Sequence, residues 1–389
     1  MADKKPNLYF RIMKGIVKNL FYLVILVNIF ILGSGKWYLY KTLWYNLPTI
    51  HDNNKFEERI IHAGIPQELP NADDYCKTAM PSLLSETLEK LQSVAFLVIK
   101  DDSVRYEKYW AGYGKASLTN SFSMAKTVIS ILIGIAVDEG KIKSVDEPVA
   151  DFLPQFKKDL GPKLTIKHLL TMSSGLNWNE SYINPLSITT EAYYGSNIPK
   201  LVAKLKVVDE PGTVWKYLSG NTLVLAAALE KATRMKVSDY ASEKLWKPIC
   251  AVNDAQWSLD KKGGEEKAYC CIYSNARDFA RIGELYLHKG NWNGKQIISD
   301  EYVNNSTKPA DLKDDEGNQI DHYGYAWWLI NVSGHHVFYA RGILGQYVFV
   351  IPDKKIVAVR LGNKRGTVTG KFVYSDIQAY IEGVLEMYP

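Results

Sequence analysis

The chain has 389 residues, of which 47% are hydrophobic and 12% aromatic, so it has enough apolar side chains to bury a large core. Its formal net charge is only +5, and no basic patch stands in the part expected to fold, which argues against a nucleic-acid-binding protein. The four cysteines and seven histidines show no zinc-ligand spacing, and the cysteines are too few for a disulfide framework. We therefore expect a globular protein without a metal or other cofactor, whose cysteines are small buried residues.

The N-terminal region contains an uncharged stretch at 19–35, which includes the almost purely apolar run LFYLVILVNIFIL. About 17 such residues are at the short limit for a helix that crosses a hydrocarbon core. Five Lys and Arg stand in the 18 residues before this stretch, and only Lys36 and Lys41 come just after it. This imbalance predicts a cytoplasmic basic segment at 1–18, a transmembrane signal-anchor at 19–35 and a periplasmic or extracellular remainder. The alternatives are a signal peptide cleaved within 33–35, which releases the domain into the periplasm, and a buried core helix.

A proline-containing connector at 36–80 precedes the predicted elements of the main domain. Helical spacing of leucines predicts a short helix at 82–92, and two strand-forming runs separated by a polar turn predict a hairpin at 94–99 and 104–110. The middle of the chain is predicted to be helical, with its clearest helices near 123–139, 165–172, 220–233 and 275–288. Strand patterns return at 322–330, 334–340, 345–351 and 355–361, before a final helix at 372–387.

Strand patterns therefore stand at both ends of the domain, and helical patterns stand between them. This arrangement predicts an α+β fold over 81–389, in which one antiparallel sheet is built from both ends of the domain, flanked by helices, with an inserted helical subdomain.

Ser123 and Lys126 stand three residues apart at the start of the apolar helix expected at 123–139, and so on one face of it. A serine hydroxyl needs a neighbouring base, and burial can lower the pKa of a lysine from about 10.4 until its amine accepts a proton. The start of a helix also stabilises developing negative charge. By itself this spacing is common, and the alternative is a helix-capping serine beside a solvated lysine.

Two later segments carry further chemistry. Tyr217 and Ser219 lie in PGTVWKYLSGN, just before the helix expected at 220–233, where a phenol can relay a proton. Ala340, Arg341 and Gly342 lie at the end of a predicted strand. A glycine there lets a substrate lie against the strand edge and lets a backbone N–H point into the site.

These three segments, in this order, with DEGKIKSVDEPVADFLP, TIKHLLTMSSGL, EKLWKPI and ARDFARIGELYL around them, resemble the serine β-lactamase and penicillin-binding protein superfamily over most of 94–389. Within it the chain is most similar to class C-like esterases and the 6-aminohexanoate-dimer hydrolase type. The resemblance implies a β-lactamase/transpeptidase-like fold, with Ser123 as acylated nucleophile, Lys126 as its base and Tyr217 as proton relay. It also implies an oxyanion hole made by the backbone N–H groups of Ser123 and Ile343.

The chain departs from the family pattern at two places. Ser219 stands where many relatives have asparagine, and Ala340 stands where a cation often holds the substrate carboxylate. The second departure argues against efficient β-lactam turnover, although an inward-facing Arg341 would compensate. The side chains that we expect to contact substrate, rather than only to pack in the core, are Ser219, Trp178, Tyr194, Arg341 and Gly342.

The expected function is an exported serine hydrolase that cleaves small esters, linear amides or cell-wall-derived peptides through an acyl-enzyme on Ser123. The alternative enzyme is a β-lactamase or DD-peptidase. The alternative of another class is a non-catalytic penicillin-binding-like sensor, although such a protein has no need of a serine, a lysine and a tyrosine together. The expected partners are a small-molecule substrate and the membrane, with no nucleic acid, and the sequence leaves the oligomeric state open.

Overall fold

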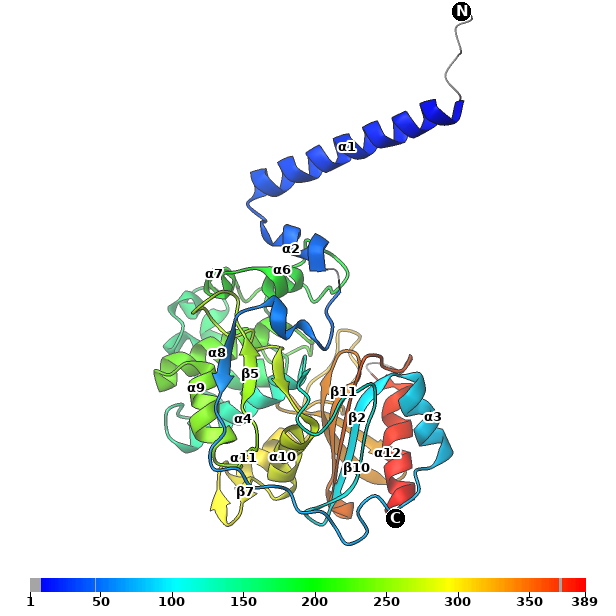
Figure 1. Cartoon of the computed structure of the whole chain (residues 1–389). Coiled ribbons are helices and arrows are strands. Elements are labelled where there is room, and N and C mark those ends of the chain that lie inside the picture. Colours follow the sequence, from blue (N-terminus) through cyan, green and yellow to red (C-terminus); the bar gives the residue numbers. More distant parts are fainter. Residues whose placement is uncertain (1–7, 46, 371–372) are drawn as a thin grey trace, which may run out of the picture.

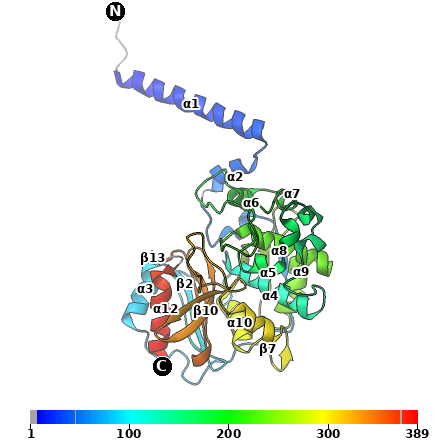
Figure 2. The same cartoon turned by 180° about the vertical axis from the view of Figure 1, so that it is seen from behind.

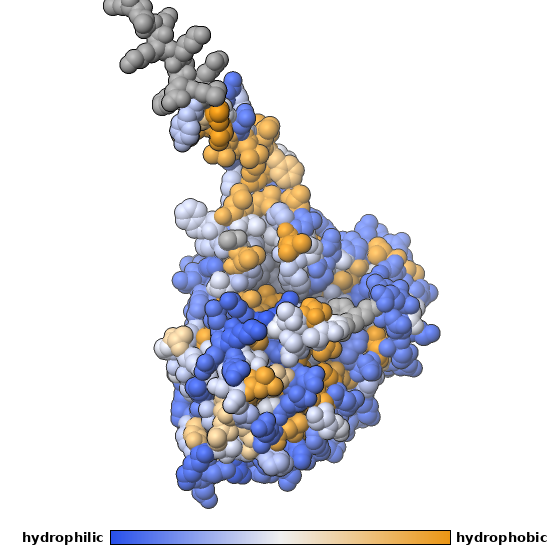
Figure 3. All heavy atoms as spheres, turned by 90° about the vertical axis from the view of Figure 1, so that its right-hand side faces the viewer, coloured by the Kyte–Doolittle hydropathy of each residue, from blue (hydrophilic) through white to orange (hydrophobic). Residues whose placement is uncertain are grey.

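In the computed structural model, which describes residues 8–45, 47–370 and 373–389, helix α1 (Leu8–Ser34) projects away from the rest of the chain (Figure 1). Its segment Ile12–Ser34 is long and apolar enough to cross a membrane, and only 6% of its apolar window is buried. Figure 3 shows these apolar side chains exposed along the helix down to the surface of the domain. A long, apolar and exposed helix near the N-terminus has the properties of a membrane anchor and of a signal peptide.

The segment 36–80, expected as a connector, packs closely against the domain. Helix α2 (Tyr38–Tyr45) buries Tyr38 against α6 (Ile188–Tyr194), and a short 3-10 helix, η1 (Asp52–Lys55), follows it. Strand β1 (Glu58–Ile61) pairs with β5 (Ala255–Ser258) at the edge of a four-stranded sheet of order β1-β5-β6-β4. This segment therefore contributes a strand to the domain, in addition to joining α1 to it.

The main sheet has six antiparallel strands in the order β3-β2-β12-β11-β10-β9. The strands that come from the two ends of the domain are β2 (Ser93–Lys100), β3 (Ser103–Tyr109), β9 (Trp328–Val332), β10 (His335–Gly342), β11 (Gln346–Ile351) and β12 (Ile356–Gly362). Because β2 pairs with β12, the predicted sheet built from both ends is confirmed, as is the α+β fold. The strand predicted at 322–330 begins only at Trp328, because the preceding residues form turns in which Ala326 has a φ of 59°.

Helices cover both faces of this sheet. On one face, α3 (Ser82–Lys90) packs against α12 (Ser375–Met387), and on the other α10 (Ala276–Leu287) contacts β11 and β12 (Figure 1). Gly283 allows this approach, because a Cβ there would lie 2.6 Å from Val357. Figure 2 shows α10 between the sheet and the helical subdomain. The remaining helices and strands are α4 (Met124–Asp138), α5 (Ile166–Leu170), α7 (Ile198–Ala203), α8 (Ser219–Thr233), α9 (Val237–Ala241), α11 (Asp300–Ser306), β4 (Thr119–Asn120), β6 (Ile272–Ser274), β7 (Asn291–Trp292), β8 (Lys295–Gln296), β13 (Val368–Gly370) and β14 (Val373–Tyr374).

The cysteines differ from the expectation of four small buried residues. Cys270 and Cys271 are buried, but a disulfide joins these two neighbours. Cys76 is exposed and Cys250 is half-buried, and both are free thiols. The spacing rule failed at Cys270 because it considers cysteines that close a loop, whereas this bond spans a single peptide unit.

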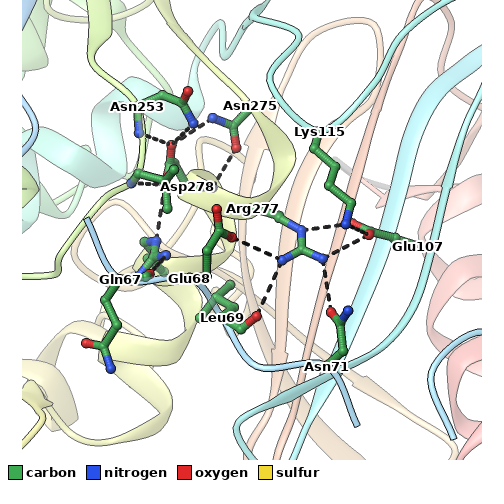
Figure 4. Close-up of polar contacts among 12 residues, drawn as sticks. Gln67, Glu68, Leu69, Asn71, Glu107, Lys115, Asn253, Asn275, Arg277 and Asp278 are labelled. Atoms are coloured by element: carbon green, nitrogen blue, oxygen red, sulfur yellow. Dashed lines mark hydrogen bonds and ion pairs between the residues drawn. The ribbon is translucent and has the colours of Figure 1, made fainter. Parts of the chain in front are cut away.

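A buried ion pair joins β3 to α10 (Figure 4). Arg277 of α10 donates from Nη2 and Nε to Glu107 of β3 at 2.8 and 3.0 Å, and both side chains are less than 10% exposed. Burial alone would raise the pKa of Glu107, but hydrogen bonds from Arg277, Tyr75, Tyr109 and Lys115 outweigh it and lower the pKa to about 2. The folded chain therefore stabilises the ionised form of Glu107 more strongly than the protonated form.

We predict that Glu107→Gln lowers the free energy of unfolding at pH 7 by roughly 3 kcal/mol, because it leaves Arg277 buried without its partner. A carboxyl whose pKa is lowered on folding stabilises fully above its unfolded pKa, which is 4.5 here, and loses this effect as the pH falls to about 2. Urea unfolding should therefore show a difference in the free energy of unfolding between wild type and variant that is constant from pH 7 to 5 and becomes smaller below pH 4.5. Glu68→Gln is the matched control, since the Glu68 side chain faces the same arginine but is 70% exposed. A difference in the free energy of unfolding that is as large at pH 3 as at pH 7 would contradict the prediction.

Candidate active site

Ser123 lies in the turn that joins β4 to α4, directly before the first residue of the helix. Phe122 holds this turn in the left-handed region with a φ of 44°, and its N–H donates to Asn120 Oδ1 at 2.8 Å. A positive φ is uncommon for a bulky side chain and costs on the order of 1–3 kcal/mol. The chain thus holds a strained turn in place beside the hydroxyl of Ser123, as occurs often at functional sites.

Lys126 lies one helical turn after Ser123, and its side chain points back toward the start of α4. Its Nζ donates to Ser123 Oγ at 3.0 Å and to the carbonyl oxygen of Tyr269 at 2.9 Å. The residue is 2% exposed, and this burial lowers the pKa of Lys126 to about 8, with Glu180 acting to raise it and Arg341 to lower it. A substantial share of the amine is therefore neutral at mildly alkaline pH, which is the form that accepts a proton.

Tyr217 lies in the extended residues before α8 and faces the same amine. The centroid of its ring is 5.1 Å from Lys126 Nζ. Burial raises the pKa of Tyr217 to about 12, while a hydrogen-bonding interaction with Ser123 and the charge of Arg341 act in the opposite direction. The phenol is therefore protonated at neutral pH and is placed to exchange a proton with groups at Ser123.

The end of β10 forms the wall opposite the helix. A Cβ on Gly342 would lie 2.2 Å from the carbonyl oxygen of Ser121, so only glycine lets the strand approach the turn before Ser123 this closely. The backbone N–H groups of Ser123 and Ile343 donate no hydrogen bond to another residue within 8–45, 47–370 and 373–389. Two such donors beside a nucleophile are what an oxyanion hole requires.

Arg341 supplies a positive charge to this wall, although Ala340 leaves the first position of the segment uncharged. Its guanidinium carbon lies 3.4 Å from the centroid of the Trp328 ring, a close cation–π contact. The same charge lowers the pKa of both Lys126 and Tyr217, which shows that the guanidinium acts on the site. The inward orientation considered from the sequence is therefore the one that the structure has.

Glu180 holds the loop before α6 against the start of α8. It accepts hydrogen bonds from Ser219 N at 2.7 Å, Ser219 Oγ at 2.6 Å, Trp178 Nε1 at 2.7 Å and the Tyr182 hydroxyl at 2.5 Å. Ser219 and Trp178, for which substrate contacts are predicted, donate to Glu180, and Glu180 lines the cavity at Ser123. The Trp178 ring also packs under Gly220, where a Cβ would be 2.5 Å from it. No motif in the sequence indicated that Glu180 would gather these donors.

Two cavities meet at Ser123 and share Tyr182 and Ile343 in their walls. The first, the charged cavity, has a volume of about 410 Å³ and includes Tyr217 and Gly342. Its charged lining residues are Glu180, Lys216, Asp314, Asp315, Arg341 and Arg365. The second, the apolar cavity, has a volume of about 340 Å³, and its aromatic wall includes Tyr193, Tyr194 and Tyr269. Tyr194, predicted to contact substrate, therefore lines a cavity that reaches Ser123, whereas Arg365 and the apolar cavity itself were not foreseen.

This geometry can be compared with known proteins. The family model described as Beta-lactamase matches residues 81–377, well over half of the chain. The chain belongs to the beta-lactamase family. It is thus a hydrolase of this family, as the order of the three segments predicted.

The proteins to which this chain is similar match most of its length. The 6-aminohexanoate-dimer hydrolase of Paenarthrobacter ureafaciens is 27% identical over 312 residues, which cover 75% of this chain and 77% of the relative. A solved structure described as a 6-aminohexanoate-dimer hydrolase from Bacillus anthracis superposes with a TM-score of 0.76 at 22% identity, covering 87% of this chain and 92% of that one. A family VIII carboxylesterase superposes with a TM-score of 0.63 at 17% identity over 85% of this chain and all of its own. The two structural matches confirm the β-lactamase/transpeptidase-like fold.

We predict that the reaction of Ser123 with a fluorophosphonate accelerates roughly tenfold from pH 7 to pH 9 and levels off above that, because the neutral fraction of Lys126 increases through a pKa of about 8. Arg341→Gln removes a positive charge that lowers this pKa, so the midpoint of the profile should move to higher pH. Arg365→Gln is the control: it removes an arginine from the same cavity that is not among the charges acting on Lys126. Stopped-flow labelling from pH 6 to 10 measures the three midpoints, and coinciding profiles for wild type and Arg341→Gln would contradict the assignment.

Proposed function

We propose that the chain is an exported acyl hydrolase that cleaves small esters or linear amides through an acyl-enzyme on Ser123. One observation carries this proposal: a buried lysine amine with a pKa of about 8 lies 3.0 Å from the serine hydroxyl. Serine is activated as a nucleophile by a neighbouring base of this kind. The similarity to a protein named 6-aminohexanoate-dimer hydrolase supports an amide substrate, and the fold shared with a carboxylesterase supports an ester substrate.

In the proposed acylation step, Ser123 Oγ attacks the substrate carbonyl and passes its proton to Lys126. The backbone N–H groups of Ser123 and Ile343 stabilise the negative charge on the carbonyl oxygen. The bond to the leaving group then breaks, as Tyr217 gives its proton to the departing oxygen or nitrogen and recovers one from Lys126. In deacylation, water attacks the acyl carbon, its proton returns through the same groups to Ser123 Oγ, and the acid is released.

The competing functions differ from this one in what they require of the site. A sensor acylates once and needs no group for deacylation, whereas here both an amine and a phenol lie beside the hydroxyl. A β-lactamase or DD-peptidase uses a cation to hold the substrate carboxylate. Arg341 brings a cation to the charged cavity, but Ala340 leaves the position where that cation often stands without a charge. On this departure from the family pattern we favour an acyl substrate without a required carboxylate.

The proposed location is the outer side of a membrane, with α1 as an uncleaved anchor. The uncharged stretch 19–35 has five basic residues in the 18 positions before it and only Lys36 and Lys41 just after it, which favours an N-terminus on the cytoplasmic side. The hydrogen bond from the Tyr40 hydroxyl to Asn28 Oδ1, 2.7 Å long, ties α1 to α2 and so supports its retention as part of the folded chain.

We predict that the full chain hydrolyses p-nitrophenyl butyrate with repeated turnover, and that Ser123→Ala and Lys126→Met each reduce kcat by roughly a thousandfold or more, since each removes a member of one catalytic unit. Ser333→Ala, which alters an exposed serine in the β9–β10 turn, is the matched control and should keep wild-type kinetics. Turnover that survives in Ser123→Ala would refute the proposal. A single burst without further product would favour the sensor, and faster hydrolysis of nitrocefin than of the ester would favour the β-lactamase.

A further inference from the structure

The apolar cavity differs in chemistry from the charged cavity beside it, although both begin at Ser123. Its wall carries the rings of Tyr193, Tyr194 and Tyr269, together with Pro185 and, at the serine end, Ile343. A cavity lined by aromatic and aliphatic groups favours an apolar occupant, because such an occupant leaves water without losing hydrogen bonds. The substrate that fills both cavities is therefore polar on one side of the scissile bond and apolar on the other.

The apolar cavity is closed on one side by the segment that follows α1. Thr42, on α2, and Leu47 and Pro48, just after it, belong to the cavity wall. Helix α2 begins only a few residues after α1 ends and packs against α6. The wall of the apolar cavity thus includes the part of the chain nearest the projecting apolar helix. Figure 1 shows α2 next to α6, at the end of the domain from which α1 projects.

Large apolar side chains stand exposed around this part of the molecule. On α2 and after it, Leu43, Trp44 and Leu47 are 69%, 84% and 66% exposed, and on the loop before α6, Ile183 is 92% exposed. A monomeric protein in water seldom exposes such a group of side chains, and where one does, the group generally contacts a protein partner or a membrane. Because the apolar helix α1 leaves the domain at this place, the membrane surface is the occupant that the observations favour (Figure 3).

The two sides of the scissile bond can be assigned to the two cavities. Tyr217, the proposed proton donor to the leaving group, lines the charged cavity and not the apolar one. The leaving alcohol or amine therefore occupies the charged cavity, among side chains of both signs. The acyl group then extends from Ser123 past Ile343 into the apolar cavity.

We propose that the substrate of this site is a membrane amphiphile: an ester or amide of a long apolar acyl chain, drawn from the lipid surface beside α2, with a polar leaving group. This inference rests on the proposed function, since it names the substrate class of the same acyl-enzyme. Ser123 Oγ forms the new bond to the acyl carbon, the bond to the alcohol or amine breaks with transfer of a proton to the leaving group, and water releases the fatty acid.

The test is a chain-length series with the full chain in nanodiscs of an ether-linked phosphatidylcholine, which has no acyl ester for the site to cleave. We expect kcat/KM to increase from p-nitrophenyl acetate to butyrate and octanoate, since each methylene that is fully buried contributes roughly a fourfold factor. The octanoate-to-acetate ratio of kcat/KM should be at least tenfold. Leu47→Asp, in the wall and rim of the apolar cavity, should reduce this ratio at least threefold.

Leu83→Asp is the matched control. Leu83 lies on α3, on the far side of the main sheet, and is 65% exposed, against 66% for Leu47. The same change at Leu83 should therefore leave the octanoate-to-acetate ratio of kcat/KM as in wild type. Thr42→Trp is a second variant, which fills the apolar cavity from α2 and should shift the preferred ester to a shorter chain.

The outcomes separate this inference from the function on which it rests. Ser123-dependent hydrolysis of acetate and octanoate at similar kcat/KM would overturn the amphiphile and leave the acyl hydrolase standing. An equal fall in the ratio for Leu47→Asp and Leu83→Asp would also overturn it, because the effect would then not be local to the apolar cavity. Absence of turnover for every ester would overturn both.

Discussion

The hydrogen bond between the Lys126 amine and the Ser123 hydroxyl is the contact around which the rest of the site is arranged. It exists because α4 is buried along almost its whole length, so that a lysine on its first turn has no route to water. An ammonium group in such a place is costly, and the protein lowers this cost by giving it the Tyr269 carbonyl as a second acceptor. The remaining penalty lowers the pKa of the amine to about 8.

Two opposite charges regulate this amine from either side. Burial has the largest effect on the pKa of Lys126, and on top of it Glu180 favours the protonated form and Arg341 the neutral one. Each is itself fixed by its surroundings. Four donors from Ser219, Trp178 and Tyr182 hold Glu180, and the Trp328 ring holds Arg341. The loop before α6 and the end of β10 therefore both act on the pKa of an amine that belongs to neither.

What could be predicted from sequence is what depends on neighbours along the chain. The helix after Ser123, the hairpin at β2 and β3 and the strands β10 to β12 follow local periodicity, and their predicted positions agree with the structure within a few residues. The role of Glu180 could not be foreseen, because its donor Ser219 is 39 residues away and no spacing rule connects them. The same holds for the apolar cavity, whose walls come from α2, the loop before α6 and Tyr269.

The place of β12 in the main sheet has a consequence for how the chain is made. Strand β2 finds its second neighbour only when Ile356 reaches Lys100, near the end of synthesis. Contacts between such distant parts of a sequence form slowly, and until then the unpaired edge of β2 is open to association with other chains. The wall at Gly342 and Ile343 also arrives late, as part of the last third of the chain. A nascent or truncated polypeptide therefore carries Ser123 without its completed surroundings, and the cavities at Ser123 are complete only when the final strands have folded.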